Sequence, residues 1–296
     1  MFHKFIALFL AALCILTTAA FAGDDKGKES AFDRVVATKT IRCAYLPYEP
    51  FIKKDLVTGH LSGIIVDYMN EIARKQGFQI DWAGEINIDQ IVLALNAKRF
   101  DAFCVPSTPD SNWAEKLGFE ASLGGLPYYI YVPFQSKFDD TSLAHAKFAV
   151  VDGYALTEIT KEAFPHAQYV SLPQTTSTAE MYDQLRYKKA DAHINEQISA
   201  SNYMKNNPDV IRRYSDKPVM APQMFLITAH DDQKIRDFIQ KEFDVNNAGN
   251  AQLMSKLLET YHVGKGSLLV GEECHSKLTP KGKKMCDLDK NEEAKQ

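Results

Sequence analysis

Residues 62–77 read SGIIVDYMNEIARKQG, and this stretch, together with the strand-like segments on either side of it, decides the fold. Ile65, Met69 and Ile72 recur at the three- and four-residue spacing of one helical face. Gly77 follows the last of the periodic residues and is well suited to end a helix, because glycine readily adopts the left-handed conformation found there. The pattern therefore predicts one amphipathic helix packed on a core.

Strands are expected before and after this helix. Residues 40–51 (TIRCAYLPYEPF) open as a short strand that its two prolines convert into a loop, and residues 78–83 (FQIDWA) alternate as a strand. A second helix is predicted in residues 87–100, followed by the buried strand 101–105 (DAFCV). The apolar residues on its predicted face are Ile88, Ile91, Val92 and Leu95.

The strand–helix order of the first unit predicts an α/β sheet, because strands joined through single helices become parallel by right-handed crossovers. A second unit of the same kind begins near residue 147, with strands at 147–151, 167–172 and 191–195. Helices are predicted between these strands, from Tyr154 and over residues 178–189. In both units an Asp-Ala pair follows a leucine six residues later, which favours two lobes of one construction over a chance match.

Two further apolar stretches, residues 127–134 (PYYIYVPF) and 223–230 (QMFLITAH), are typical of strands. If the helical patterns after residue 234 complete the first lobe, these stretches are paired crossovers that form a hinge. The expected organisation is a signal peptide 1–22, a flexible lead-in 23–36, lobe 1 over 37–133 with 226–262, lobe 2 over 134–225, and a C-terminal tail 263–296.

The N-terminus has the features of a secretory signal peptide: Lys4, an apolar run from Phe5 to Leu16, and the sequence Ala20-Phe21-Ala22 before polar residues. We therefore expect cleavage after Ala22 and a periplasmic protein. An uncleaved membrane anchor is the alternative, although the run is short for a membrane span. A lipoprotein modification of Cys14 is disfavoured because the residue before it is leucine.

Composition narrows the possible functions. The 296 residues are 45% hydrophobic, enough for a large core, and the net charge is −4. Because the chain has no basic excess to neutralise phosphates, nucleic acid is not expected as a partner. The histidines and cysteines lack metal-ligand spacing, so neither a metal nor a cofactor is predicted.

Four cysteines remain after cleavage, and four cysteines allow three pairings in an oxidising compartment. Cys274 and Cys286 lie close together in the tail, so we predict a disulfide between them. Cys43 and Cys104 each lie in a predicted buried strand of the same lobe, and either a bridge or two buried thiols fit the sequence.

Between residues 38 and 262 the chain resembles the extracellular solute-binding proteins, of the family 3 type, that serve polar amino acid ABC importers. The resemblance is carried by an ordered set of segments: IRCAYLPYEPF (41–51), TGHLSGIIVDYMNEIARKQG (58–77), LNAKRFDA (95–102), TPD (108–110), PYYIYV (127–132), VVDGYALTE (150–158) and LRYKKADAHINE (185–196). It implies a two-lobed α/β fold of the periplasmic-binding-protein type (type II), with two hinge strands, closure on a small-molecule ligand, and transient delivery by a monomer to an ABC permease.

The resemblance also implies ligand-binding residues. Tyr48 falls where the family places an aromatic ring over the ligand, although it could instead anchor its loop. Glu196 falls at the family's aspartate for the ligand's amino group, although a solvated carboxylate at a helix start would also fit. Thr108 lies in the matching TPD segment. Gly153 and Tyr154 form the turn of the second lobe, whose backbone N–H groups could attract an anion even though the family's hydroxyl is missing.

The chain departs from the family where an arginine should clamp the ligand's carboxylate, because Trp113 stands near that position. A negative Glu196 without the expected cation favours cationic solutes, with cation–π attraction from Tyr48 and Trp113. Trp113 could equally pack against its own lobe. Two other functions stay open at this point: a dehydratase-like enzyme on the same fold, and an exported accessory or sensor subunit that binds a protein through the tail.

Overall fold

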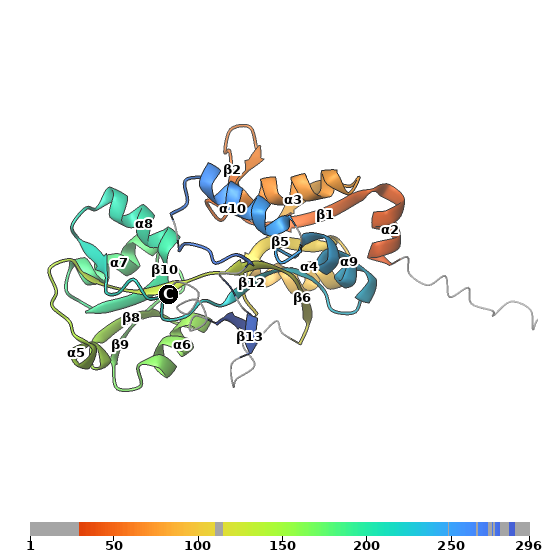
Figure 1. Ribbon diagram of the computed structural model, residues 1–296. Helices are drawn as coiled ribbons and strands as arrows, with labels where there is room; N and C mark the ends of the chain where they lie inside the picture. Colours follow the sequence, from red (N-terminus) through yellow and green to blue (C-terminus); the bar gives the residue numbers. More distant parts are fainter. Residues whose placement is uncertain are drawn as a thin grey trace, which may run out of the picture.

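The computed structural model describes residues 30–109, 115–247, 249–264, 266–271, 274, 276–278 and 284–287. These residues form two lobes, each built on one five-stranded sheet with helices packed against it (Figure 1). No helix among them is long and apolar enough to cross a membrane.

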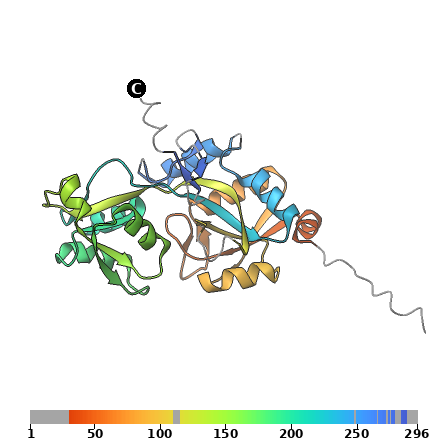
Figure 2. The ribbon, with the colours of Figure 1, turned by 90° about the horizontal axis from the view of Figure 1, so that it is seen from below.

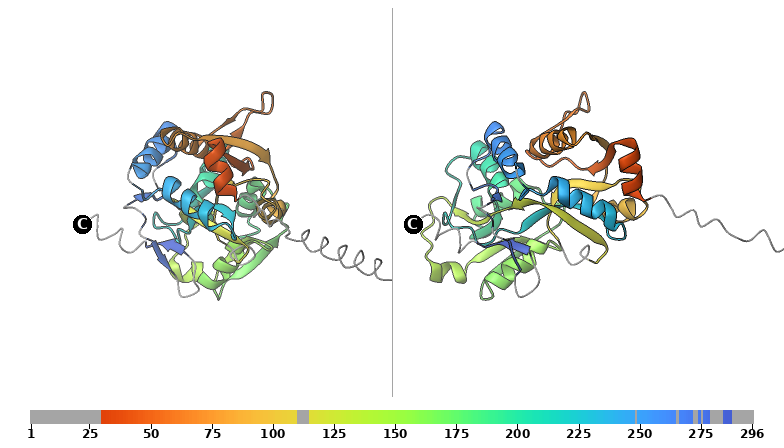
Figure 3. Two further views of the ribbon diagram at one scale, coloured as in Figure 1. Left: turned by 90° about the vertical axis from the view of Figure 1, so that its right-hand side faces the viewer. Right: turned by 45° about the vertical axis from the view of Figure 1, so that its right-hand side comes forward.

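The first lobe contains the predicted helix of residues 62–77, which begins at Ile64 and ends at Lys75, just before Gly77 with its φ of 74°. Its elements are α2 (Ala31–Thr38), β1 (Thr40–Tyr45), β2 (Lys53–Lys54), β3 (Leu61–Ser62), α3 (Ile64–Lys75), β4 (Gln79–Glu85), η1 (Ile88–Gln90), α4 (Ile91–Asn96), β5 (Ala102–Ser107), β6 (Leu117–Gly125), β12 (Gln223–Ala229), α9 (Gln233–Phe243) and α10 (Asn250–Thr260). The sheet order is β4-β1-β5-β12-β6. Helices α3 and α10 pack against each other on this lobe (Figure 3).

The second lobe repeats the parallel core of the first. Its elements are β7 (Tyr128–Pro133), α5 (Asp140–Ala144), β8 (Lys147–Val151), α6 (Ala155–Ala163), β9 (Gln168–Leu172), α7 (Thr178–Arg186), β10 (Ala192–Glu196), α8 (Gln197–Asn206) and β11 (Ile211–Arg213). The sheet order is β11-β7-β10-β8-β9, in which β8 is parallel to both β9 and β10. Strand β7 is antiparallel to both of its neighbours, β10 and the edge strand β11.

The lobe boundaries differ from those expected. Strand β7 belongs to the second sheet, and β12 belongs to the first from its start at Gln223. The chain therefore crosses between Gly125 and Tyr128, and again between Met220 and Gln223. The two crossings bond to each other, because the N–H of Tyr128 donates to the Met220 carbonyl at 2.8 Å. The apolar pattern of residues 127–134 predicted a strand but not the sheet that it joins.

Both chain ends of the first lobe are more ordered than expected. Residues 31–36, predicted as part of a flexible lead-in, lie in helix α2, where Val35 is fully buried. Ser30 caps this helix by accepting a hydrogen bond from the Asp33 N–H. At the other end, Leu268 and Val270 of the predicted tail are buried in the core of the first lobe. Both segments contain apolar side chains that are buried in the core, and this burial explains why they are ordered.

Helix α4 also differs in one residue. Ile88 was expected on its buried face, but it lies in the 3-10 turn η1 and is 59% exposed. The helix proper begins at Ile91, which is buried together with Leu95, while Val92 is half-buried at the cleft described below. The change from 3-10 to α-helical spacing shifts Ile88 off the core-facing stripe.

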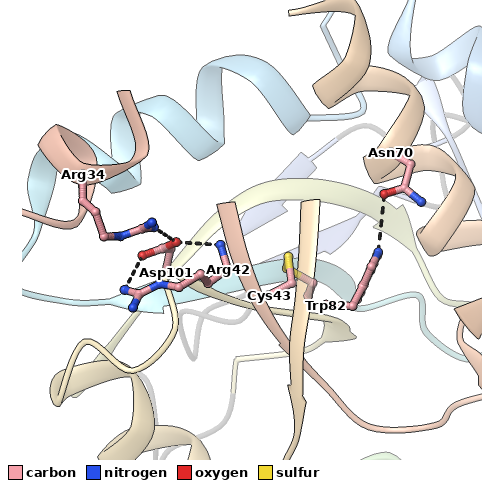
Figure 4. Close-up of a disulfide and its surroundings, with 7 residues drawn as sticks. Arg34, Arg42, Cys43, Asn70, Trp82 and Asp101 are labelled. Carbon is pink, nitrogen blue, oxygen red and sulfur yellow. Dashed lines mark hydrogen bonds and ion pairs between the residues drawn. A yellow bond between two sulfur atoms is a disulfide. The ribbon is translucent and has the colours of Figure 1, made fainter. Parts of the chain in front are cut away.

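A disulfide joins Cys43 of β1 to Cys104 of β5, at a sequence separation of 61. Close by, the Asp101 carboxylate is buried between the guanidinium groups of Arg34 and Arg42 (Figure 4). The structure thus has a bridge where the sequence left two possibilities, and the first lobe is cross-linked both covalently and by an ion pair network.

Candidate functional site

A cleft of about 1460 Å³ lies between the two lobes. The first lobe lines it with the loop after β1, the β4–α4 connection and the end of β5, and the second lobe with the starts of α6, α7 and α8. The residues that line the cleft include Tyr48, Glu85, Asp89, Thr108, Tyr128, Gly153, Tyr154, Gln174, His193 and Glu196. Because several segments distant in sequence meet here, the cleft is the candidate ligand site.

Glu196 is the central charged residue of the cleft. It is the last residue of β10 and directly precedes α8, and it is only 6% exposed. The Ser199 hydroxyl donates a hydrogen bond to its Oε1. Burial raises the pKa of Glu196, and the Ser199 hydrogen bond acts in the opposite direction. The alternative of a solvated helix-start carboxylate is wrong, because the side chain is buried.

Two tyrosines lie near this carboxylate. Tyr128 stands opposite Glu196 in the β7–β10 register, and Tyr48 reaches the same region from the first lobe. Burial raises the pKa of both phenols, and the Glu196 charge raises them further. Tyr48 also pairs through its backbone with Ile52, at 2.8 and 2.9 Å, so it both anchors its loop and lines the cleft.

Gly153 and Tyr154 lie in the turn before α6, on the second lobe's side of the cleft. Gly153 has a φ of 76°, so its backbone conformation favours glycine, and a Cβ there would also displace the terminal amide of Gln174. Tyr154 precedes the first residue of α6 and is 46% exposed. The turn therefore presents the positive end of a nine-residue helix to the cleft.

Two of the predicted ligand-binding residues remain, Thr108 and Trp113. Thr108 lines the cleft just after β5 and is half-buried. Trp113, the residue in the place of the expected arginine, lies outside the described residues. Of the predicted ligand-binding set, the structure brings Tyr48, Thr108, Gly153, Tyr154 and Glu196 to one cleft.

His193 is a cleft residue that sequence reasoning missed. Its Nδ1–H donates to the Ala149 carbonyl at 2.9 Å, and its Nε2 has no hydrogen-bond partner among the described residues. Burial lowers the pKa of His193 to about 4, so the ring is neutral at physiological pH. Its spacing from Glu196 gave no signal, because residues three apart on a strand point to opposite faces of the sheet. Tyr128 was missed as well, because residues 127–134 were interpreted only as a hinge strand.

The charged side chains in the described lining of the cleft are all acidic. Its described lining contains the carboxylates of Glu85, Asp89 and Glu196 but no lysine or arginine side chain. Lys54 approaches the rim and pairs with Glu85 at 2.7 Å, where both groups are partly exposed. In the part of the chain that the structure describes, no cluster of three or more His, Cys, Asp or Glu residues is arranged to hold a metal ion.

The tail disulfide predicted between Cys274 and Cys286 is present in the structure. It lies at the crossover segments, where both sulfurs are buried with Ala221. The cleft lining does not include either cysteine.

Comparison with known proteins places these features in context. Residues 41–259 match the model of the bacterial extracellular solute-binding proteins, family 3. A probable histidine-binding protein of Campylobacter jejuni is 26% identical over 246 residues, which cover 80% of this chain and 90% of the relative. A probable amino-acid ABC transporter-binding protein of Haemophilus influenzae is 28% identical, covering 70% of this chain and 80% of the relative.

Among solved structures, an ancestral amino acid-binding protein described as a precursor of cyclohexadienyl dehydratase has a TM-score of 0.59 at 19% identity. It covers 78% of this chain and 99% of its own. At this identity the likeness supports the fold, and the two-lobed type II architecture is therefore shared.

Proposed function

Because the chain belongs to the bacterial extracellular solute-binding proteins of family 3, we propose that its cleft captures a cationic amine or a cationic amino acid for an ABC importer. The observation that carries the proposal is the buried Glu196 carboxylate, which has a hydroxyl partner but no lysine or arginine in the described cleft lining.

A buried carboxylate without a cation is unfavourable, and the raised pKa of Glu196 expresses that cost. A ligand ammonium or guanidinium group would supply the missing charge and strengthen the charged form of the glutamate. Asp89 adds negative charge at the rim of the same cleft, whereas the charge of Glu85 is balanced by Lys54. The site is therefore better suited to a cation than to a dianion.

The tyrosines favour the same class of ligand. Tyr48 and Tyr128 flank the carboxylate from two segments, and an ammonium group over either ring would gain about 0.5 to 2 kcal/mol, more when water is excluded. An amino acid's own carboxylate would lie toward the N-terminus of α6, where Gly153 and Tyr154 present backbone donors. The anchor at that end is weak compared with a guanidinium clamp.

The proposed binding function also implies where the protein acts. We infer export through the N-terminal signal, with cleavage after Ala22, and action as a monomer in the periplasm that docks transiently on its permease. Intact mass of the secreted product should begin at Gly23. We also infer that the ligand leaves unchanged, so the cleft binds rather than catalyses.

The test is a thermal-shift screen of the mature protein against amines, betaines, cationic amino acids and dicarboxylates. A ligand at 100 times its Kd stabilises the folded state by about 2.7 kcal/mol, which is a readily measured shift. We expect cationic solutes to give the largest shifts, and mass spectrometry to recover them unaltered. A dicarboxylate as best ligand would overturn the cationic assignment, and a converted product would favour an enzyme.

A further inference from the structure

The C-terminal segment lies on the two crossover segments between the lobes, and not apart from them (Figure 2). We call the described residues between Gly266 and Cys286 the clasp. Its short strands β13 (Ser276–Leu278) and β14 (Lys284–Cys286) pair with each other, and the disulfide Cys274–Cys286 closes it.

The clasp binds the first crossing where the chain leaves β6. The N–H of Gly125 donates to the Leu269 carbonyl at 2.8 Å, and the N–H of Leu269 donates back to the Gly125 carbonyl at 2.8 Å. This reciprocal pair is an antiparallel bridge, so the clasp continues the sheet of the first lobe beside the crossing.

The clasp binds the second crossing as well. The N–H of Cys286 donates to the Ala221 carbonyl at 2.9 Å, and Met285 forms an antiparallel bridge with Pro222. Gln223 Nε2 donates to Cys274 Sγ at 3.4 Å. The disulfide is thus held against this crossing, where Cys286 is 1% exposed.

The same segment also touches the second lobe. After α10 of the first lobe, the chain reaches Gly266, whose carbonyl accepts a hydrogen bond from the Tyr129 hydroxyl at 3.1 Å. Tyr129 belongs to β7 of the second sheet. The chain then returns to Leu269 and the first lobe, so it spans the hinge a third time.

Closure of two lobes around a ligand requires the backbone of the crossings to change its dihedral angles. Both crossings are hydrogen-bonded on one side to each other and on the other side to the clasp, and the disulfide joins Cys274 in the middle of the clasp to Cys286 at its end. We propose that the clasp is a third interlobe connection that stiffens the hinge and limits how far the lobes move apart and together. The inference rests on the two-lobe binding function, which closure serves, but not on the identity of the solute.

Two variants remove the clasp in different ways. Gly125→Ala should displace the clasp and its disulfide while both cysteines stay in place, because a Cβ at Gly125 would overlap Cys286 Sγ. Cys274→Ser with Cys286→Ser removes the disulfide and leaves Gly125 and the rest of the clasp unchanged. Gly84→Ala is the matched control, since its Cβ would meet the Phe100 ring at 2.9 Å in the same sheet, away from the clasp.

Hydrogen exchange of the Leu269 and Cys286 amides reports whether the clasp is engaged. The interlobe distance is measured without ligand by dipolar spectroscopy between spin labels on unnatural residues at Leu56 and Tyr187, which are 94% and 61% exposed in the first and second lobes. A screen that finds no solute would refute the proposed function, but it would leave the exchange and distance measurements of the clasp unaffected.

We expect both clasp variants to exchange these amides at least tenfold faster and to broaden the distance distribution about twofold, with Gly84→Ala unchanged in both. Faster exchange with an unaltered distribution would show that the clasp does not restrain the hinge. Amides that stay protected in both variants would show that the bonds to Gly125 and Ala221 are not what holds the segment, which also overturns the proposal.

Discussion

The two lobes contain the same turn between a helix and a strand. In the first, Lys98 has a φ of 56° and Asp101 directly precedes β5; in the second, Lys188 has a φ of 55° and Asp191 directly precedes β10. The N–H of each aspartate donates to the strand alongside, to the carbonyls of Arg42 at 2.9 Å and Lys147 at 2.7 Å. The shared Asp-Ala spacing noted in the sequence is therefore a shared backbone device.

The two aspartates nevertheless have different surroundings. Asp101 is 2% exposed and pairs with the guanidinium groups of Arg34 and Arg42. Asp191 is half-buried, and its carboxylate accepts from the Lys147 backbone N–H at 3.0 Å. The same turn is thus an ion pair centre in one lobe and a simple strand connection in the other.

Buried polar atoms without hydrogen-bond partners among the described residues occur in both lobes. They are the Nε atoms of Arg34 and Arg42 and the Thr228 hydroxyl in the first lobe, and the Tyr131 and Tyr182 hydroxyls and His193 Nε2 in the second. The lobes differ instead in their cross-links, because the first contains the disulfide between Cys43 and Cys104. The first lobe is therefore a platform stabilised by its disulfide and ion pairs, whereas the second lobe holds the buried Glu196 carboxylate at a cost in stability.

The largest effect is expected from removing the platform's disulfide. Replacing Cys43 and Cys104 together by serine opens a loop of 61 residues, which the chain-entropy model values at about 4 kcal/mol. Urea unfolding, followed by hydrogen exchange in each lobe, should show the loss in first-lobe peptides. Equal losses in both lobes would mean that the lobes unfold as one unit and that the platform is not separately stabilised.

The paired aspartates give a matched comparison of smaller size. Asp101→Asn leaves two guanidinium groups without their carboxylate and should cost about 3 kcal/mol, at the low end for a buried pair because the arginine side chains are 22% and 28% exposed. Asp191→Asn should cost about 1 kcal/mol, the value of one hydrogen bond. Urea midpoints of the two variants decide the point, and similar losses would contradict the difference between the turns.

Acidic pH should destabilise the second lobe because of the buried, neutral His193. Because its pKa is lowered to about 4 in the folded state, the unfolded chain binds the proton more readily, and stability falls as the pH drops from about 6.5 to 4. The loss reaches roughly 2 to 3 kcal/mol for a shift of this size. His193→Gln should reduce the acid sensitivity of unfolding by this amount, while His60→Gln, at an exposed site, should not. An unchanged pH profile in His193→Gln would refute the role.

Much of the fold was readable from the sequence because local patterns and burial agree. The helix α3 and strands β1, β5, β8 and β10 form where apolar periodicity predicted them. Strand β6 was missed, since Gly118, Gly124 and Gly125 give its sequence little strand character. Its position is set by antiparallel pairing with β12, which lies about a hundred residues further along the chain and leaves no local signal.

The site was predictable only as far as the resemblance extended. Tyr48 and Glu196 could be named from matched segments, and both line the cleft. Tyr128 and His193 could not be named in this way, because their places in the cleft depend on how β10 pairs with its neighbouring strands. That register places Tyr128 opposite Glu196. The clasp was interpreted as an appendage, because its charged composition conceals the few buried residues, such as Leu268 and Cys286, that hold it in place.

The smallest expected change in stability, and the most informative, concerns Glu196. Because burial raises its pKa, the folded state favours the protonated carboxyl, so its contribution to stability is present at acid pH and is lost as the pH rises through the raised value. Glu196→Gln removes this penalty, and the ligand-free variant should melt at a higher temperature than the natural protein at pH 7.5, with a smaller difference at pH 4.

The same variant should bind a cationic solute at least tenfold more weakly, a loss of about 1.4 kcal/mol, because the charge partner is gone. Glu85→Gln at the exposed rim is the control and should change both quantities less. A residue whose role is ligand binding should affect stability and affinity in opposite directions. Its charge destabilises the free protein, and this cost is recovered only when the ligand's cation binds. A variant that is both less stable and still fully active would make Glu196 a structural residue and move the site toward the start of α6.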